Sequence, residues 1–336
     1  MVATEMLRTP VERLLREVRP APSLIISDRH LAWTADLAQD LGIPRILFDG
    51  MSCFAHLCMH NLHLYKPHEK DVRKRIRESA ETAHAVIINS FEELEPENIE
   101  TYRKTSEGAR AWCIGPVSLC NKNMLDVSQR GNRSSEDESH LLDWLNCLPP
   151  GRKKWGGAWN HRKSPFIWVI RRVNQGEELE QWLSEDGFEE RVKGRCLLIR
   201  GWAPQVLILS HPLVGGFLTH CGWNSKLEGI SAGVPMVTWP LFAEQFYNEE
   251  MIMEVLRFGV GAKEVVHLGN EDEHGVMVKG KDIKVAVDNV MSEDEKGEER
   301  RKRAKKLAKK ASKAVEQAGS SYLNIKKLIE KVFILW

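Results

Sequence analysis

The 336-residue sequence has no long apolar run, no charge imbalance and few cysteines. No stretch approaches the roughly 18–20 apolar residues that a membrane-spanning helix needs, and the first residues lack the basic-then-apolar pattern of a signal peptide. The formal net charge is +1, which gives no overall attraction to nucleic acid or acidic membranes. The seven cysteines show no paired spacing, which favours reduced thiols over a disulfide framework. We therefore expect a cytoplasmic protein with no membrane span and no nucleic-acid partner.

What the sequence does contain is the composition of a globular protein and enough length for two domains. Hydrophobic residues make up 42% and charged residues 28%, which separates the chain from disordered and fibrous proteins. Short apolar runs alternate with helical patterns, and these runs are residues 22–28, 44–48, 85–90, 112–116, 166–170, 196–199, 214–218 and 235–239. Strands that alternate with helices predict an α/β fold with parallel sheets.

Two neighbouring segments interrupt this alternation. Residues 121–150 are rich in Asn, Ser, Asp and Glu and predict a surface linker. Residues 151–163 are basic and rich in Gly and Trp, with neither the strand nor the helix period. The C-terminal third is helical, with a basic run between Arg300 and Lys313. That run could be a localisation signal, but its helical spacing favours the solvated face of an amphipathic helix.

One stretch in the second half of the chain predicts an anion site. An apolar strand ends at His220, a turn contains Gly222, and a helical pattern begins at Asn224 or Ser225, both good N-cap residues. The N-terminus of a helix binds anions because its free N–H groups and positive dipole end face the ligand. His220 can donate a hydrogen bond to the same anion. The residues predict a phosphate or diphosphate site at a strand's carboxyl end, with an ordinary capped junction as the alternative.

Residues on both sides of this stretch could bind the rest of a nucleotide sugar. Trp202 follows an earlier strand, where its indole could stack on a flat base. Glu228 comes one helical turn after Asn224, and its carboxylate could accept hydrogen bonds from ribose hydroxyls. Glu244 and Gln245 open the helix after the last of the strands and can bind sugar hydroxyls.

These positions form a fixed pattern over 44 residues, from Trp202 to Gln245. The pattern resembles the plant secondary-product glycosyltransferase signature, the donor-binding motif of plant UDP-dependent glycosyltransferases. The matching residues are Trp202-Ala203-Pro204-Gln205, His211-Pro212, Gly215-Gly216-Phe217, His220-Cys221-Gly222-Trp223-Asn224-Ser225, Glu228, Ala232-Gly233-Val234-Pro235, Trp239-Pro240 and Glu244-Gln245. Further matches lie elsewhere in the chain, at Ser27-Asp28, Pro44-Arg45, residues 89–94, Gly115-Pro116 and residues 165–171.

The resemblance implies a fold of the GT-B type, with two Rossmann-like domains facing across a cleft. On that basis residues 1–120 form a partial N-terminal acceptor-binding domain and 121–164 a linker and irregular segment. Residues 165–320 form the C-terminal UDP-sugar donor-binding domain. Residues 321–336 form a C-terminal helix that packs back on the N-terminal domain.

The resemblance also implies a role for each donor-binding residue. Trp202 matches a tryptophan that stacks on uracil, the backbone of Ala203 bonds the edge of the base, and Glu228 matches the ribose ligand. The remaining donor-binding residues are His220, Asn224 and Ser225 for the diphosphate, Trp223, Glu244 and Gln245 for the sugar, and Gln205 and Gly222. A glutamine at the last position is typical of glucose donors. Lys226 departs from the family, and we expect it to add positive charge near the phosphates.

The reaction implied is transfer of a sugar from UDP-glucose to a hydroxyl of a small lipophilic acceptor, such as a flavonoid or terpenoid, with inversion. The UDP-sugar is a co-substrate, and no cofactor or metal is implied. The reaction needs a general base and a site for the leaving diphosphate. Asp28 matches the aspartate that holds the family's base, a histidine that would precede Met1. His30 is near Asp28, but alternation along an extended segment would point both side chains the same way without pairing them.

A second departure lies inside the chain. After residues 149–151 the family continues with a strand, a Gly-Ser turn and a helix, whereas here residues 152–163 lead directly to Pro165. The first strand and helix of the donor domain are therefore expected to be lost or replaced. A catalytically inactive remnant that at most binds UDP-sugar is the alternative to an active transferase.

A histidine cluster offers one other kind of site. His56, His60 and His63 share a helical face, which could suggest a metal. No closed four-ligand spacing appears, so a helix that lines a pocket is the favoured interpretation.

Overall fold

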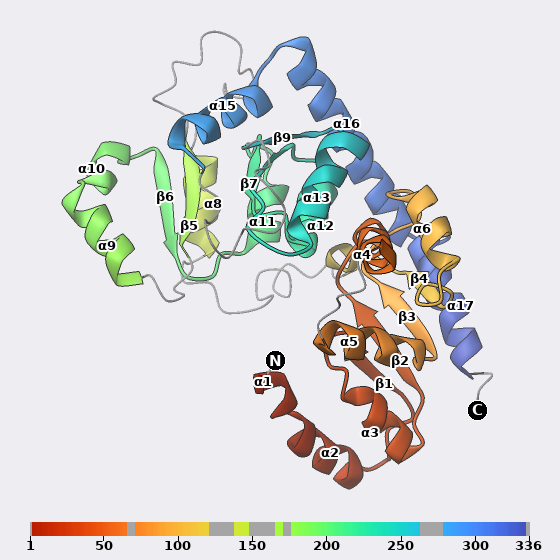
Figure 1. The fold of residues 1–336 in the computed structure, drawn as a ribbon. Coiled ribbons are helices and arrows are strands. Elements are labelled where there is room, and N and C mark those ends of the chain that lie inside the picture. The colour runs from red at the N-terminus through yellow and green to blue at the C-terminus, as the bar shows by residue number, and fades with distance from the viewer. Residues whose placement is uncertain are drawn as a thin grey trace.

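The structure is a computed structural model that describes residues 2–65, 71–120, 138–147, 165–170, 176–262 and 278–333. The chain forms two α/β halves, and its last helix returns to the first half (Figure 1). The elements of the first half are α1 (Val2–Glu5), α2 (Arg8–Glu17), β1 (Ile25–Asp28), α3 (Thr34–Leu41), β2 (Arg45–Asp49), α4 (Cys53–Tyr65), α5 (Asp71–Glu81), β3 (Ala85–Ile88), α6 (Pro96–Arg103), β4 (Ala111–Cys113) and the 3₁₀ turn η1 (Val117–Leu119).

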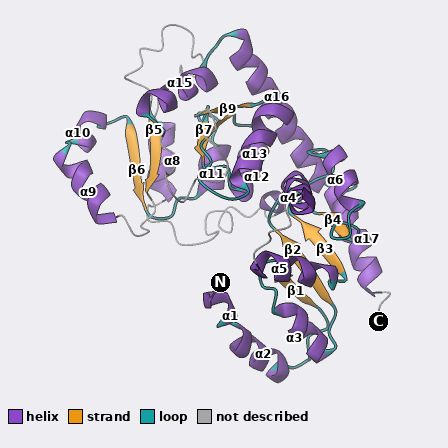
Figure 2. Cartoon of the chain, in the orientation of Figure 1, coloured by secondary structure: helices purple, strands orange, loops and turns teal. Residues whose placement is uncertain are grey.

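The second half alternates helices and strands in the same way (Figure 2). Its elements are α8 (Glu138–Asn146), β5 (Phe166–Ile170), α9 (Gly176–Glu185), α10 (Phe188–Val192), β6 (Cys196–Arg200), α11 (Gln205–Ser210), β7 (Phe217–Thr219), α12 (Trp223–Ala232), β8 (Met236–Thr238), α13 (Gln245–Glu250), the π-helix η3 (Met251–Val255), β9 (Gly259–Gly261), α15 (Gly280–Met291), α16 (Glu295–Val315) and α17 (Ser320–Phe333).

The first half contains one parallel sheet in the order β1-β2-β3-β4. The register pairs Asp28 with Phe48 and Asp49 with Ile88, so the carboxyl ends of the first three strands lie at one edge. Helix α3 ends where Gly42 takes a left-handed conformation (φ 65°) and donates its N–H to the last helical carbonyls. This is the C-cap that the sequence predicts for a glycine.

In the described residues the second half contains two sheets rather than one. The strands β5 and β6 pair in parallel, and β7, β8 and β9 form a separate parallel sheet. On β5 and β7, apolar side chains are partly exposed, as Phe166 (39%) and Leu218 (44%) show. Unpaired strand edges with apolar side chains are unfavourable in a parallel sheet, which is normally covered on both faces. The segment in which the loss of a strand was expected, residues 151–163, lies outside the described part of the chain.

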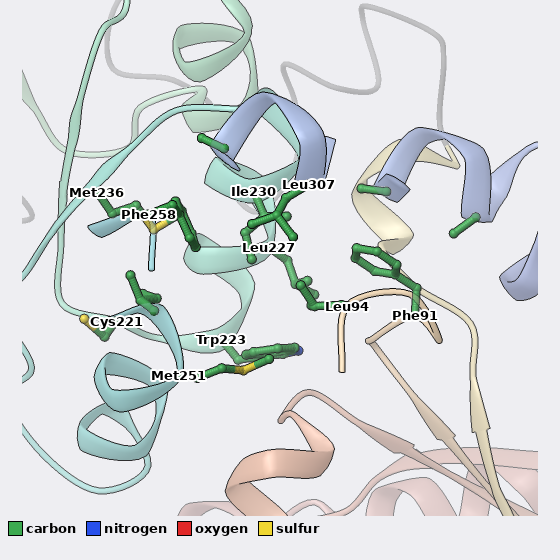
Figure 3. Close-up of a cluster of buried hydrophobic side chains, with 14 residues drawn as sticks. Phe91, Leu94, Cys221, Trp223, Leu227, Ile230, Met236, Met251, Phe258 and Leu307 are labelled. Carbon is green, nitrogen blue, oxygen red and sulfur yellow. The ribbon is translucent and has the colours of Figure 1, made fainter. Parts of the chain in front are cut away.

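The two halves share a hydrophobic core. Phe91 and Leu94, which follow β3, pack in one cluster with Trp223, Leu227 and residues of η3 and α16 (Figure 3). The buried positions of α16 are Gly297, Ala304, Leu307, Ala311 and Ala314. This is the apolar face of an amphipathic helix that the sequence predicts, with the lysines and arginines mostly on the other side.

Helix α17 ties the chain's last described residues to the first sheet. The Ser321 hydroxyl donates to the carbonyl of Gly115, and the Asn324 amide donates to the carbonyl of Cys113 at 2.9 Å. Leu328 is buried with Ile46 and Ile87 of the sheet.

One helix lies where the sequence predicted only linker. Helix α8 buries Leu141 and Leu145 against Leu197 and Ile199 of β6. Its apolar positions recur at helical spacing, but the polar residues before them hid this pattern. The irregular residues 151–163 lie outside the described part of the chain. No helix in the described part is long and apolar enough to cross a membrane.

Candidate donor-binding site

A cavity of about 2690 Å³ lies in the second half and reaches the first. Its walls include the loop that follows β6, the carboxyl end of β7, the N-terminus of α12 and residues of β5 and β7. Gly50, which follows β2, lines it from the first half. The cavity therefore joins the place predicted for a nucleotide sugar to the carboxyl edge of the first sheet.

The base and ribose end of the site is built around α11. Trp202 follows β6 through Gly201, which has a φ of 118° that favours glycine, and it lines the cavity. The next residue, Ala203, is 9% exposed and packs in the core beneath. The Gln205 amide donates to Glu228 Oε2 at 2.6 Å and to Ser225 Oγ at 3.2 Å. Gln205 thus holds in place the Glu228 carboxylate, predicted to bind the ribose, and the Ser225 hydroxyl, predicted to bind the diphosphate.

The phosphate end is the N-terminus of α12. The N–H of Lys226 donates to the carbonyl of Gly222 at 3.0 Å, which closes the first helical turn. The N–H groups of Trp223, Asn224 and Ser225 come before that bond and have no partner within the helix. Such groups, at the positive end of the helix dipole, form an anion site.

His220 lies directly over the turn that precedes this helix. The side chain is exposed at the end of β7, and a Cβ atom added at Gly222 would lie 2.5 Å from its Nε2. The glycine therefore leaves the space that the imidazole occupies. This is the arrangement expected for a histidine that donates to a bound phosphate.

Trp223 was expected to contact the sugar, but its indole points elsewhere. The side chain is 2% exposed, and its Nε1 donates to the carbonyl of Asn89 at 2.6 Å. Asn89 also donates through Nδ2 to Asn224 Oδ1 at 3.1 Å. The indole thus joins α12 to the residue that follows β3. Trp223 also lines the cavity, and its contact with the sugar stays a prediction.

Lys226 was expected to add charge near the phosphates, but it does not line the cavity. It is fully buried on the far face of α12, where its Nζ bonds Asn248 Oδ1 at 3.4 Å and lies 4.2 Å from the Trp223 ring centroid. Burial lowers the pKa of Lys226 to about 7, while the carboxylate of Glu95 acts in the opposite direction. The lysine belongs to the contact between the halves.

The two predicted sugar ligands at the start of α13 differ from each other. Glu244 lines the cavity, as a sugar ligand should. Gln245 is 2% exposed, and its Oε1 accepts from the N–H groups of Leu241 and Phe242 at 2.9 and 3.2 Å. The structure does not present Gln245 to the sugar, because its side chain holds the loop before α13.

Asp28 ends β1, at the edge of the first sheet that faces the second half. It does pair with His30, against the expectation from strand alternation. Asp28 Oδ1 accepts from the backbone N–H of His30 at 2.8 Å and lies 3.1 Å from its Nδ1. The strand ends at Asp28, and the turn that follows brings the imidazole back over the carboxylate.

Beside this pair is a buried charged network that sequence reasoning missed. Asp49 is 1% exposed and lies 2.7 Å from His56 Nε2 and 3.2 Å from Arg29 Nη1. The Arg29 guanidinium also bonds Glu107. Burial raises the pKa of Asp49, but its contacts with His56 and Arg29 hold it well below the usual range. His56 therefore serves this network, and in the described ranges no group of three or more His, Cys, Asp or Glu side chains could hold a metal.

The chain is similar to known proteins over almost its whole length. A family model described as UDP-glucoronosyl and UDP-glucosyl transferase matches residues 185–318, which include the motif. UDP-glycosyltransferase 73C6 of Arabidopsis thaliana is 42% identical over an aligned length of 388 residues, covering 99% of this chain and 78% of the relative. UDP-glycosyltransferase 73C11 of Barbarea vulgaris matches with the same identity and coverage. The aligned length exceeds the 336 residues of this chain, so the relatives contain residues with no counterpart here.

Solved structures give the same result. Glycyrrhiza uralensis UGT73P12, crystallised with glycyrrhetinic acid 3-O-monoglucuronide, is 33% identical with a TM-score of 0.84, over 98% of this chain and 76% of that one. Arabidopsis thaliana UGT89C1, crystallised with UDP-L-rhamnose, is 28% identical with a TM-score of 0.72, over 97% and 77%. The expected fold class, α/β of the GT-B type with Rossmann-like halves, is confirmed. The chain belongs to the plant UDP-glycosyltransferase family, whose members take a UDP-sugar as co-substrate.

Proposed function

We propose that this chain transfers a sugar from a UDP-sugar to a hydroxyl of a small lipophilic plant metabolite, with inversion at the anomeric carbon. The observation that carries the proposal is the single cavity lined by Trp202, His220, Glu228 and Glu244 and, from the other half, by Gly50. A donor held along the first four residues would point its sugar toward the acceptor half.

The chemistry required is stabilisation of the leaving diphosphate. The first-turn N–H groups of α12 and the His220 imidazole are suited to charge that grows on the β-phosphate as the glycosidic bond breaks. Because they are held by the fold before the donor binds, they need little reorganisation during the reaction.

For the donor we propose UDP-glucose, and for the acceptor a terpenoid or flavonoid hydroxyl. Support for the acceptor class comes from relatives, since UGT73P12 was crystallised with a glycyrrhetinic acid glucuronide and UGT89C1 with quercetin. Support for glucose comes from the family motif at Glu244-Gln245, of which only Glu244 lines the cavity.

A second candidate function is donor binding without transfer. It is favoured by the division of the donor half into two sheets in the described residues, since the family has a strand and a nucleotide-contacting turn in that region. A chain of this kind would bind UDP and release no product.

The test is product formation under conditions that separate these candidates. Purified protein is incubated with UDP-glucose, UDP-rhamnose or UDP-glucuronate and a panel of phenolic and triterpenoid acceptors, and glycosides are detected by mass spectrometry. We expect a glucoside as the main product. UDP binding without any glycoside would favour the second candidate, and absence of both would contradict the family function for this chain.

A further inference from the structure

One asparagine of the first half contacts the N-terminus of α12 in the second half. Asn89 directly follows β3 and is 4% exposed. Its carbonyl accepts the indole N–H of Trp223 at 2.6 Å, and its Nδ2 donates to Asn224 Oδ1 at 3.1 Å. Both partners lie in the first turn of α12. Asn89 therefore reaches the phosphate end of the candidate site from the acceptor half.

A backbone donor fixes the orientation of the Asn89 amide. The N–H of Val117 donates to Asn89 Oδ1 at 3.0 Å. Because a backbone N–H can only donate, the amide oxygen must face Val117 and the amide nitrogen must face Asn224. Gly115 leaves the room for this arrangement, since a Cβ atom there would lie 2.5 Å from Asn89 Oδ1.

The orientation of Asn89 decides what the Asn224 amide offers to a ligand. The Nδ2 group of Asn89 only donates, so Asn224 must turn its Oδ1 toward it. The N–H groups of Asn224 Nδ2 are then the part of the amide left for a ligand, and Asn224 is exposed and lines the cavity. A donor in this place suits a diphosphate, whose oxygens accept charge-assisted hydrogen bonds. The opposite orientation would turn the amide oxygen toward the anion.

The backbone on both sides of the Asn89 side chain is also held by the first half. The N–H of Asn89 donates to the carbonyl of Asp49 at 3.0 Å, at the end of β2. The carbonyl of Ser90 accepts from the N–H of Gly115 at 2.7 Å, in the loop after β4. Because these bonds exist before a donor binds, the orientation of Asn89 needs no reorganisation when the diphosphate arrives.

We propose that Asn89 is a positioning residue for the diphosphate, and that it acts by orienting the Asn224 amide so that Nδ2 donates to the phosphate oxygens. The inference rests on the proposed function and deepens it, because it assigns one part of the donor site to the acceptor half. The phosphate end of the site is then complete only while Asn89 of the first half contacts α12 of the second.

The test is UDP affinity, measured by calorimetry, in Asn89→Asp. This variant keeps the size of the side chain and an acceptor for the N–H of Val117, but its second oxygen cannot donate, so Asn224 must turn its Nδ2 toward the new carboxylate. We expect affinity to fall by roughly tenfold or more, the scale of one hydrogen bond to a charged group, and by less in Asn89→Ala, which leaves Asn224 unheld. Asn324→Ala is the matched control and should bind UDP normally, because its amide donates to the carbonyl of Cys113 and holds α17 rather than α12.

Two further measurements separate positioning from simple structural support. Uridine, which lacks the diphosphate, should bind Asn89→Asp and the unchanged protein equally in NMR titrations. In an Asn224→Ala background, Asn89→Asp should cause no further loss of UDP affinity, because the two residues act as one unit. Normal UDP affinity in Asn89→Asp, an equal loss for uridine, or a full loss in the Asn224→Ala background overturns the proposal while leaving the transferase function intact. No UDP binding and no transfer by the unchanged protein overturns both.

Discussion

Side chains of similar chemistry in the donor motif have different surroundings. The Gln205 amide donates to the two oxygen-bearing groups of the site, whereas the Gln245 amide accepts from backbone N–H groups of its own loop. Lys226 and His220 lie on the same strand–turn–helix junction, but one is buried and the other exposed. Motif residues therefore either line the cavity or hold a loop beside it.

Gln205→Ala tests the first of these roles. Without its amide, Glu228 and Ser225 lose the partner that fixes them. A hydrogen bond to a charged group contributes about 1.5–3 kcal/mol, so we expect UDP affinity to fall by roughly tenfold or more. Calorimetric titration measures it, and Gln181→Ala, an exposed glutamine on α9, is the matched control. Equal affinities for the two variants would contradict the positioning role of Gln205.

Lys226→Met tests the buried charge between the halves. The pKa of Lys226 in the folded protein, about 7, lies below its ordinary value of 10.5. Between these values the unfolded chain binds more protons, so the free energy of unfolding should rise with pH from about 7 to about 10. We expect this rise to be smaller in Lys226→Met than in Lys309→Met, an exposed lysine on α16. Denaturant melts across this pH range measure it, and identical slopes would show that Lys226 stays charged when folded.

At the scale of elements, the site depends on strand–turn–helix junctions. The junction from β7 to α12 brings together an exposed histidine, a close-packed glycine and free helix N–H groups. The same helix contacts β3 through Trp223 and Asn224. The donor site and the contact between the halves are therefore parts of one rigid element.

Gly222→Ala changes this junction alone. The added methyl group would lie 2.5 Å from His220 Nε2, so the imidazole must leave its place beside the turn before α12. We expect UDP affinity to fall by about tenfold, the scale of one hydrogen bond to a charged group. Gly280→Ala is the control, since a Cβ there has no atom within 4 Å. A normal affinity for Gly222→Ala in calorimetry would mean that His220 does not bind the diphosphate.

The sequence predicted the strands of both halves and the loops that follow them, because buried parallel strands are continuous apolar runs between helical patterns. It missed β9, a strand of three residues, because two of the three are glycines and glycine is depleted in strands. It also missed the contact of Asp28 with His30 and the inward turn of Gln245. The Asp28–His30 contact and the buried side chain of Gln245 both lie at turns. The alternation of apolar and polar residues predicts strands and helices, but it does not predict how side chains are oriented in the turns between them.

At the scale of the whole molecule, the two halves have unequal sheets. The first half has one continuous sheet of four strands, and the described second half has sheets of two and three strands. The shared core of Phe91, Leu94 and α12, together with α17, attaches the divided half to the continuous one. In the described residues, these contacts link the two sheets of the second half to the sheet of the first.

Backbone amide hydrogen exchange should differ between strands that are paired on both edges and strands that are paired on one. Among the described residues, strands β2, β3 and β8 are paired on both sides, whereas β5 and β7 have one paired edge each. Amides open to solvent through local fluctuations exchange early, so we expect peptides from residues 166–170 and 217–219 to exchange faster than those from 46–49 and 85–88. Bound UDP at about 100 times its Kd adds about 2.7 kcal/mol to stability and should slow exchange in the donor half. Equal protection of these four segments would contradict the division of the sheet.

The central claim, that this chain has a working UDP site at α12, is tested most directly by calorimetric titration with UDP. We expect binding in the unchanged protein and in Trp182→Ala, whose side chain is 46% exposed on α9. Trp202→Ala should lose about 1–3 kcal/mol of binding free energy, the scale of base–aromatic stacking. A folded, monodisperse sample that binds no UDP, or a Trp202→Ala variant that binds it unchanged, would contradict the account.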